Sequence, residues 1–304
     1  MWNSFYKDIE ENPVLKWEAC DNVSGLSGVS FIDPSFIRLI NRTMKYKCEL
    51  PDYHLVLLSQ DMTFPNLKEI LEVYSFVTQI SKTKIKRNAK ITLIPLDIPK
   101  ELDGSNFSPR NINSGVCINF QEIYIWRKEE MTKVLCHELI HMLHLDYLEF
   151  QDEIRHIPRK LFTLARNVQT EPNEATTDTL ALVIMSFINA KRLKRSPEEI
   201  FKLEVDWTIK QMFKIWRNLK EEITFTSDII SYFFLKGFLL FYLLKNPGTI
   251  DIFLHNTILT QQDPSIDTIR DILLDYKNLI EFEKYSATLQ LDTTSTLRMS
   301  CFSI

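Results

Sequence analysis

The apolar pattern of the chain changes at Lys128, and this change constrains the fold more than any other feature of the sequence. Before it, stretches with helical spacing of apolar residues are mixed with β-rich runs. Helices are expected at 34–47 and 65–82, and strands at 53–59, 90–96, 115–120 and 122–126. After it, the spacing predicts helices at 128–145, 172–190, 196–220 and 228–244. The sequence therefore predicts an α+β protein, with a mixed α/β lobe over residues 1–147 and an all-helical lobe over residues 148–304.

The composition excludes several classes of protein. Of the 304 residues, 45% are hydrophobic and 25% are charged, which is typical of a globular chain. The net charge of −4 gives no basic excess, so no nucleic-acid partner is expected. The 6 glycines form neither a G-x-G-x-x-G nor a G-x-x-x-x-G-K pattern, which argues against a phosphate-binding loop.

The cysteines and the apolar segments indicate an intracellular, cytoplasmic protein that is not secreted. The 5 cysteines are scattered and include no C-x-x-C pair, as expected of reduced thiols. Residues 1–15 contain acidic side chains and no apolar core of a signal peptide. The most apolar stretch, 229–244, is short and contains Lys236, so we expect a buried helix and no membrane span. Lys236 is expected either to reach the surface or to face a cleft. The sequence gives no signal for an oligomeric state.

The segment H-E-L-I-H, from His137 to His141, lies inside the helical pattern that follows the strand pair. At 100° per residue, His137 and His141 differ by about 40° in azimuth and by one turn in height, so both imidazoles can point at one metal ion. Glu138 lies beside this point and could accept a proton from water on the metal. The alternative is a pair of ordinary histidines on a core or surface helix.

Two histidines do not complete a catalytic zinc site, which needs three protein ligands and one open position. Glu174 and Asp178, in the segment N-E-A-T-T-D, are one helical turn apart. One carboxylate could bind the ion while the other accepts a hydrogen bond from a ligating histidine. The alternative is a helix N-terminus whose acidic residues favour the helix dipole. His144 could line the cleft or simply pack, and Cys136 is expected in the core.

These two segments together resemble the gluzincin arrangement of thermolysin-like zinc metallopeptidases, in which N-E-x-x-[ST]-D follows H-E-x-x-H. The resemblance implies a zincin-like fold with an edge strand over the cleft and the active-site helix between the two lobes. It implies Zn²⁺ ligation by His137, His141 and Glu174, with Glu138 as general base and Asp178 as hydrogen-bond partner of His137. It covers about residues 113–178, and the connection between His141 and Glu174 is longer than the family's usual one. A metzincin is excluded because positions 144 and 147 hold His and Tyr rather than Gly and His.

A second resemblance concerns the residues around this motif. Asn113-Ser114-Gly115, the segment 123–130 and the segment 232–236 are similar to uncharacterised zincin-like proteins of large DNA viruses. This resemblance implies a viral source, with the host cytoplasm or the virion as the compartment. It implies no substrate.

The expected function is zinc-dependent hydrolysis of peptide bonds in a peptide or protein substrate. The developing oxyanion needs a hydrogen-bond donor, which in gluzincins is a Tyr or His of the C-terminal lobe. The resemblance therefore implies this role for Tyr232, or as second choice for His255, although a tyrosine on an apolar helix can also be a core residue. Asn113 and Ser114, where the loop enters the edge strand, would hold the substrate backbone, unless they only form a turn. The alternative function is a catalytically inactive zincin fold that serves as a structural or binding protein, including a viral component.

Overall fold

The computed structural model describes residues 6, 8–9, 12–20, 32–81, 83–101, 109–146, 171–218, 230–248, 250, 281–282, 284–289, 296 and 298–302. The chain divides into two compact units. The first unit comprises Met1–Lys100, Asn113–His144 and Ser303–Ile304, and the second comprises Glu101–Ile112 and Leu145–Phe302. The mixed α+β character expected from the sequence is confirmed. The division into lobes at residues 147 and 148 stays a prediction.

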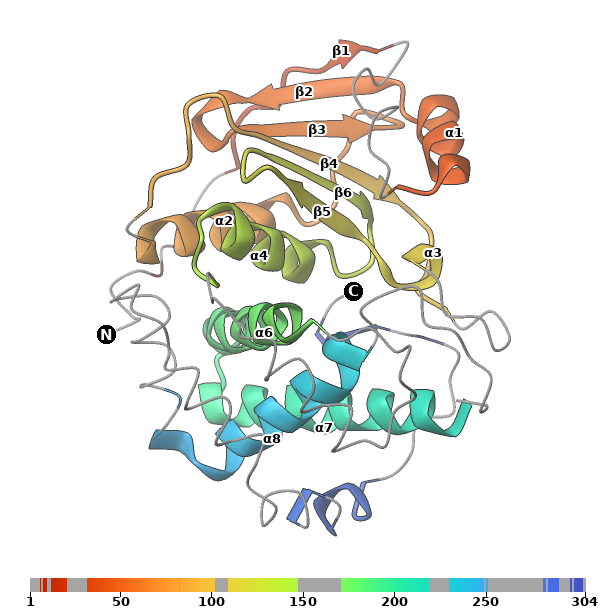
Figure 1. Cartoon of the computed structure of the whole chain (residues 1–304). Helices are drawn as coiled ribbons and strands as arrows, with labels where there is room; N and C mark the ends of the chain where they lie inside the picture. Colours follow the sequence, from red (N-terminus) through yellow and green to blue (C-terminus); the bar gives the residue numbers. More distant parts are fainter. Residues whose placement is uncertain are drawn as a thin grey trace. The chain divides into compact units, whose positions relative to one another are not determined.

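Within its described residues, the first unit contains a six-stranded sheet with the order β1-β2-β3-β4-β6-β5 (Figure 1). The strands are β1 (Glu18–Ala19), β2 (Tyr46–Leu50), β3 (Leu55–Ser59), β4 (Lys90–Leu96), β5 (Gly115–Ile118) and β6 (Glu122–Arg127). The central neighbours β3, β4 and β6 run parallel, whereas β1, β2 and β5 pair antiparallel with their neighbours. The strand β5 therefore lies at one edge of the sheet.

Helices cover both faces of this sheet. Successive side chains of a strand point to opposite faces, so a central strand contributes residues to both of these contacts. On one face, Tyr124 and Trp126 of β6 pack with Phe36 and Ile40 of α1 (Pro34–Thr43). On the other face, α4 (Met131–Met142) packs on β5 and β6 and against α2 (Leu67–Ile80). The parallel strands are apolar on both sides, as expected of strands covered on both faces. The helix that carries the H-E-x-x-H segment is thus fixed on the sheet beside its edge strand.

Two details of the first half of the chain differ from the sequence-based expectation. The helix expected to run to residue 47 ends at Thr43, and β2 begins at Tyr46. Met44 already has an extended backbone, and Tyr46 pairs with Ser59 of β3, so sheet pairing overrides the local helical spacing. Residues 109–112, for which the sequence pattern predicts neither a helix nor a strand, form a short helix, α3 (Pro109–Ile112).

In the second unit, the longer elements that the structure describes are helices. They are α6 (Pro172–Leu193), α7 (Pro197–Asn218), the π-helical segment η4 (Ile230–Leu235) and α8 (Lys236–Lys245). Both α7 and α8 pack on α6. These helices confirm the elements expected at 172–190, 196–220 and 228–244, although the last one starts as a π-helix.

Residues 296 and 298–302 lie along α7, where three side chains of the helix bind them. Lys214 Nζ donates to the carbonyl oxygen of Thr296 at 2.7 Å, and Trp207 Nε1 donates to that of Arg298 at 3.0 Å. Glu204 accepts hydrogen bonds from the Ser300 hydroxyl at 2.6 Å and the Cys301 N–H at 3.0 Å. Because Glu204 and Lys214 are buried, these bonds satisfy charged groups that would otherwise be costly to bury.

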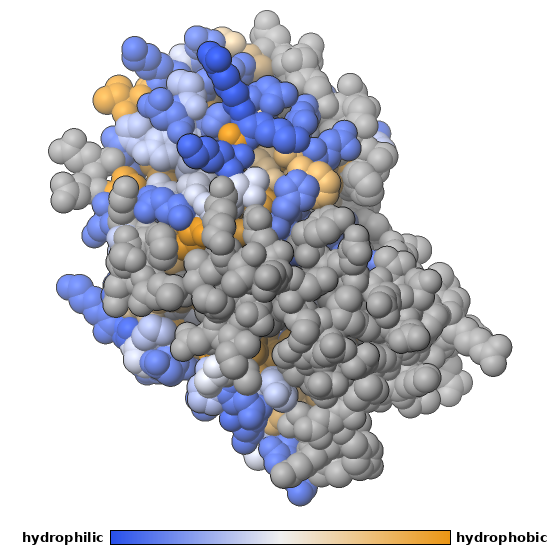
Figure 2. All heavy atoms as spheres, turned by 60° about the vertical axis from the view of Figure 1, so that its left-hand side comes forward, coloured by the Kyte–Doolittle hydropathy of each residue, from blue (hydrophilic) through white to orange (hydrophobic). Residues whose placement is uncertain are grey.

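The described surface is largely hydrophilic, and the described helices are those of a globular chain, as the composition predicts. On the face shown in Figure 2, hydrophilic side chains cover most of the coloured surface. None of the helices in the described part of the chain combines the length and the apolar character that crossing a membrane requires. Lys236 is fully buried, so the first of its two alternatives, that it reaches the surface, is wrong.

Candidate functional site

The start of α4 is fixed by a buried ion pair. Glu130, the residue before the helix, has a left-handed backbone with φ 62°. Its carboxylate lies 2.7 Å from Lys100 Nζ, and both side chains are buried. Burial lowers the pKa of Lys100, while the neighbouring Glu130 carboxylate opposes this shift. The pair ties the segment after β4 to the beginning of α4.

One turn of α4 brings two imidazole rings together. His137 and His141 are four residues apart, and their Nε2 atoms lie 3.1 Å from each other. Two ring nitrogens at this distance either share a proton or both point at one cation. In a tetrahedral zinc site with Zn–N bonds of about 2.0–2.1 Å, neighbouring ligand atoms lie about 3.3 Å apart. The pair therefore matches the spacing of two zinc ligands without a change of backbone.

Glu138 lies on the same helix, buried against the edge strand. A Cβ atom placed on Gly115 of β5 would lie 2.8 Å from Glu138 Oε1 and 2.6 Å from Val134 Cγ1. Real Cβ atoms do not approach other atoms this closely, so the carboxylate occupies space that exists only because residue 115 has no side chain. This role of Gly115 does not follow from the residues near it in sequence; the available signal is a glycine at the start of a strand.

The register of β5 decides which of its backbone groups face away from the sheet. The N–H of Trp126 in β6 donates to the carbonyl oxygen of Ser114 at 2.9 Å, so Ser114 faces β6. In an antiparallel pair, hydrogen-bonded residues alternate with residues whose N–H and C=O point outward. The outward groups are therefore those of Gly115 and Cys117. The carbonyl oxygen of Asn113 accepts a hydrogen bond from Arg127 Nε at 3.2 Å. The carbonyl oxygens of Asn113 and Ser114, the two residues predicted to hold the substrate backbone, thus accept hydrogen bonds within the unit.

In the second unit, the predicted ligand Glu174 lies in the first turn of α6 and is half-buried. The hydroxyl of Tyr232, in η4, donates to Glu174 Oε2 at 3.0 Å. The N–H of Glu171 donates to Ser231 Oγ at 2.8 Å, which ties the beginning of α6 to η4. Tyr232, the candidate for oxyanion stabilisation, therefore lies beside the predicted third ligand. His255, the second candidate, lies outside the described residues.

One turn further along α6, Asp178 forms a buried ion pair. Lys236 Nζ lies 2.7 Å from Asp178 Oδ2, and both side chains are fully buried. Asp178 was predicted to bind a histidine, whereas Lys236 had no assigned partner. The signal available in the sequence was a single lysine within an otherwise apolar helix, since a buried ammonium group requires an anionic partner. Lys236 thus holds the Asp178 carboxylate in place on α6.

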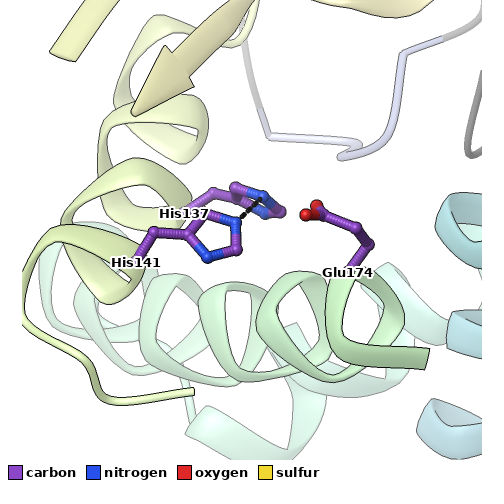
Figure 3. A group of neighbouring side chains, drawn as sticks. All are labelled: His137, His141 and Glu174. Atoms are coloured by element: carbon purple, nitrogen blue, oxygen red, sulfur yellow. Dashed lines mark hydrogen bonds between the residues drawn. The ribbon is translucent and has the colours of Figure 1, made fainter. Parts of the chain in front are cut away.

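Three side chains could hold a metal ion. Within the described part of the chain, His137, His141 and Glu174 form such a group, each offering one ligand atom. Figure 3 shows the two rings on α4 and the carboxylate on α6. Two imidazole nitrogens and one carboxylate oxygen are the donor set of catalytic zinc sites of the His₂Glu type. The donor chemistry of these residues therefore fits Zn²⁺.

Glutamate at position 138 adds a group that a purely structural metal site does not need. Structural zinc sites are closed by four protein ligands, whereas catalytic sites have three and leave one position open. The set of two histidines and one glutamate fits the second type.

Comparisons of the chain with protein-family models, with curated proteins and with solved structures find no match.

Proposed function

We propose that the protein is a zinc-dependent metallopeptidase with a gluzincin-like, zincin-type arrangement, which hydrolyses peptide bonds. The observation that carries the proposal is the 3.1 Å approach of the His137 and His141 Nε2 atoms next to the buried Glu138. Glu174 is the proposed third ligand. When bound, zinc supplies Lewis-acid chemistry, because it polarises the substrate carbonyl and lowers the pKa of water.

The side chains of this protein perform the proton transfers. Glu138 takes a proton from the attacking water and delivers it to the leaving amine, so no covalent enzyme intermediate is formed. The carbonyl oxygen of the substrate gains negative charge in the transition state and needs a hydrogen-bond donor. Tyr232, whose hydroxyl donates to Glu174 in this structure, is the proposed donor. Asp178, held by Lys236, is the proposed hydrogen-bond partner of His137.

The substrate is an extended peptide that adds to the sheet beside β5. An edge strand offers its outward N–H and C=O groups to such a peptide. By register, the outward groups that lie next to Glu138 belong to Gly115. Since Gly115 also lies against Glu138, a peptide bonded to it would have its backbone close to the proposed general base.

Removal of the metal is the direct test. Dialysis against a strong chelator is expected to abolish cleavage of a peptide library, as read by mass spectrometry of the products, and added Zn²⁺ to restore it. Elemental analysis of the native protein is expected to give about one zinc per chain. Full hydrolysis after complete metal removal would contradict the proposal. Zinc binding without hydrolysis of any peptide would favour the alternative of an inactive zincin fold used as a structural or binding protein.

Replacement of Gly115 tests the contact between the edge strand and Glu138. Gly115→Ala is expected to destabilise the fold by about 1–3 kcal/mol, since the new methyl group overpacks the space beside Val134. It is also expected to lower kcat about 10- to 100-fold because the Glu138 carboxylate must move. Urea unfolding and peptide cleavage measure the two effects.

Gly237→Ala is the matched control for this variant. A Cβ atom on Gly237 would lie 3.6 Å from Met212 Sδ and 3.7 Å from Thr208 Cγ2, which are ordinary contact distances. The substitution is expected to stabilise α8 by about 0.5–1 kcal/mol and to leave kcat unchanged. If the alanine at position 115 were tolerated equally well, the close approach of β5 to Glu138 would be wrong.

A further inference from the structure

We propose that Phe120 and His144 form an aromatic platform that binds an aromatic side chain of the substrate, three or four residues from the cleaved bond. This inference rests on the proposed function, because it concerns the substrate of the same site. Both residues belong to the first unit. They lie at the tip of the β5–β6 hairpin and directly after α4.

The backbone at the hairpin tip is unusual for its sequence. Asn119 and Phe120 have φ values of 50° and 54°, and the N–H of Gln121 donates to the carbonyl oxygen of Ile118 at 3.0 Å. A tight turn with two consecutive positive φ values favours Asn, Asp and Gly. Asn119 fits this preference, whereas a phenylalanine in the left-handed region is an outlier. Position 120 therefore holds a phenylalanine in a backbone conformation that this residue type rarely adopts.

Burial of the ring does not offset the cost of this backbone conformation, because Phe120 is 44% exposed. Its contact is with a second ring. The centroids of Phe120 and His144 lie 4.1 Å apart, with 37° between the ring planes. His144 also has a left-handed backbone, with φ 54°, and its N–H donates to the carbonyl oxygen of His141 at 3.0 Å. Two residues with left-handed backbones, of which Phe120 is the outlier for its residue type, thus meet from separate elements to form a partly exposed aromatic surface. Strain of this kind is concentrated at functional sites.

The position of this surface indicates its ligand. The outward backbone of β5 starts at Gly115, beside Glu138, and the strand ends at Ile118, just before the tip. At 3.4 Å per residue, these three steps span about 10 Å. An extended peptide paired with β5 would therefore bring its third or fourth residue from the cleaved bond to Phe120. Aromatic side chains prefer offset or edge contacts with an exposed ring, which makes them the matching substrate class.

The consequence is a requirement for substrates that extend well beyond the cleaved bond. A platform about 10 Å from the general base has no contact with the end of a dipeptide or tripeptide. We therefore infer an endopeptidase with an aromatic preference remote from the cleaved bond.

The test uses the full-length, zinc-loaded protein and peptides with blocked termini. A single phenylalanine is moved through an alanine-rich sequence around one cleavable bond. For the wild type, kcat/KM is expected to be roughly three- to tenfold higher with phenylalanine at the third or fourth position than with alanine there. Phe120→Asn is expected to bring this ratio close to one, and Phe120→Trp to keep it.

Stability separates a binding role from a structural one. Because Asn readily adopts the left-handed region, Phe120→Asn is expected to leave the Tm unchanged or to raise it. Met62→Asn is the matched control, since Met62 is likewise exposed, by 48%, and has φ 63°. It is expected to leave the Tm unchanged or raised and the substrate preference intact.

Three results would overturn the platform. The first is a wild type that cleaves without positional preference, the second is an unchanged preference in Phe120→Asn, and the third is a preference lost only together with several degrees of Tm. If the wild type cleaves no peptide at all, the proposed function fails separately. The affinities of wild type and Phe120→Asn for the phenylalanine peptide then decide the platform, with equal affinities overturning it and weaker binding by the variant supporting it.

Discussion

Replacing Glu138 with glutamine is expected to lower kcat for peptide hydrolysis by about 10²- to 10⁴-fold, the usual contribution of a general base. Glutamine has almost the same shape, so it fits the space beside Gly115, but it does not accept a proton at neutral pH. His137 and His141 are unchanged in this variant, so zinc content is expected to stay near that of the wild type. Steady-state kinetics and elemental analysis on the same preparation measure both quantities.

Glu199→Gln is the control for this variant. Glu199 lies on the exposed start of α7, where it forms a surface ion pair with Arg195. A surface pair of this kind contributes little, so stability is expected to change by less than about 1 kcal/mol and kcat not at all. Undiminished hydrolysis by Glu138→Gln would show that the base is another residue. Loss of zinc together with activity would show that Glu138 acts on the metal site itself.

Lys236→Met is expected to lower the free energy of unfolding by about 3–5 kcal/mol, the cost of removing one partner of a buried ion pair. The variant removes the ammonium group that lies 2.7 Å from the fully buried Asp178 carboxylate. Methionine fills a similar volume, so the loss is electrostatic rather than a cavity effect. Urea unfolding followed by circular dichroism measures the change.

The exposed pair of Lys202 and Asp206 provides the comparison. Its Nζ–Oδ2 distance of 2.8 Å is nearly the same, but the Lys202 side chain is 56% exposed. Lys202→Met is therefore expected to cost less than about 1 kcal/mol. A double variant, Lys236→Met with Asp178→Asn, is expected to recover part of the loss, because no charge is then left without its partner. Equal small costs for the two lysines would contradict the burial of the Lys236 pair.

The local spacing of apolar residues predicts which helices and strands this fold contains better than it predicts where they begin and end. The helix from 34 was expected to reach 47 because its apolar spacing continues, yet pairing of Tyr46 with Ser59 starts a strand instead. Such pairing depends on residues far along the chain, which periodicity does not contain. Helical spacing of 228–244 gave the right element, but the π-helical start of this element at Ile230–Leu235 has no sequence signal of its own.

The same distinction applies to the candidate site. The spacing of His137 and His141 within one helix predicts that their rings reach the same point, and this needs only helix geometry. The role of Gly115 depends on how closely β5 approaches α4, and the partner of Lys236 depends on how α8 packs on α6. Both features depend on contacts between elements that are far apart in the sequence. A glycine in a strand and a single lysine in an apolar helix indicate that positions 115 and 236 are unusual. They do not indicate which residues lie next to them in the folded protein.

The contacts of residues 296 and 298–302 with α7 also affect the order in which the protein folds during synthesis. The first unit has its sheet and α4 by His144, whereas the buried charges of Glu204 and Lys214 wait for residues 296–301. At about 5–20 residues per second, the ribosome delivers those residues roughly eight to thirty seconds later. Until then the buried charges of α7 lack these hydrogen-bond partners, so the helical unit completes its packing last, and incompletely packed stages of this kind are the ones prone to aggregation.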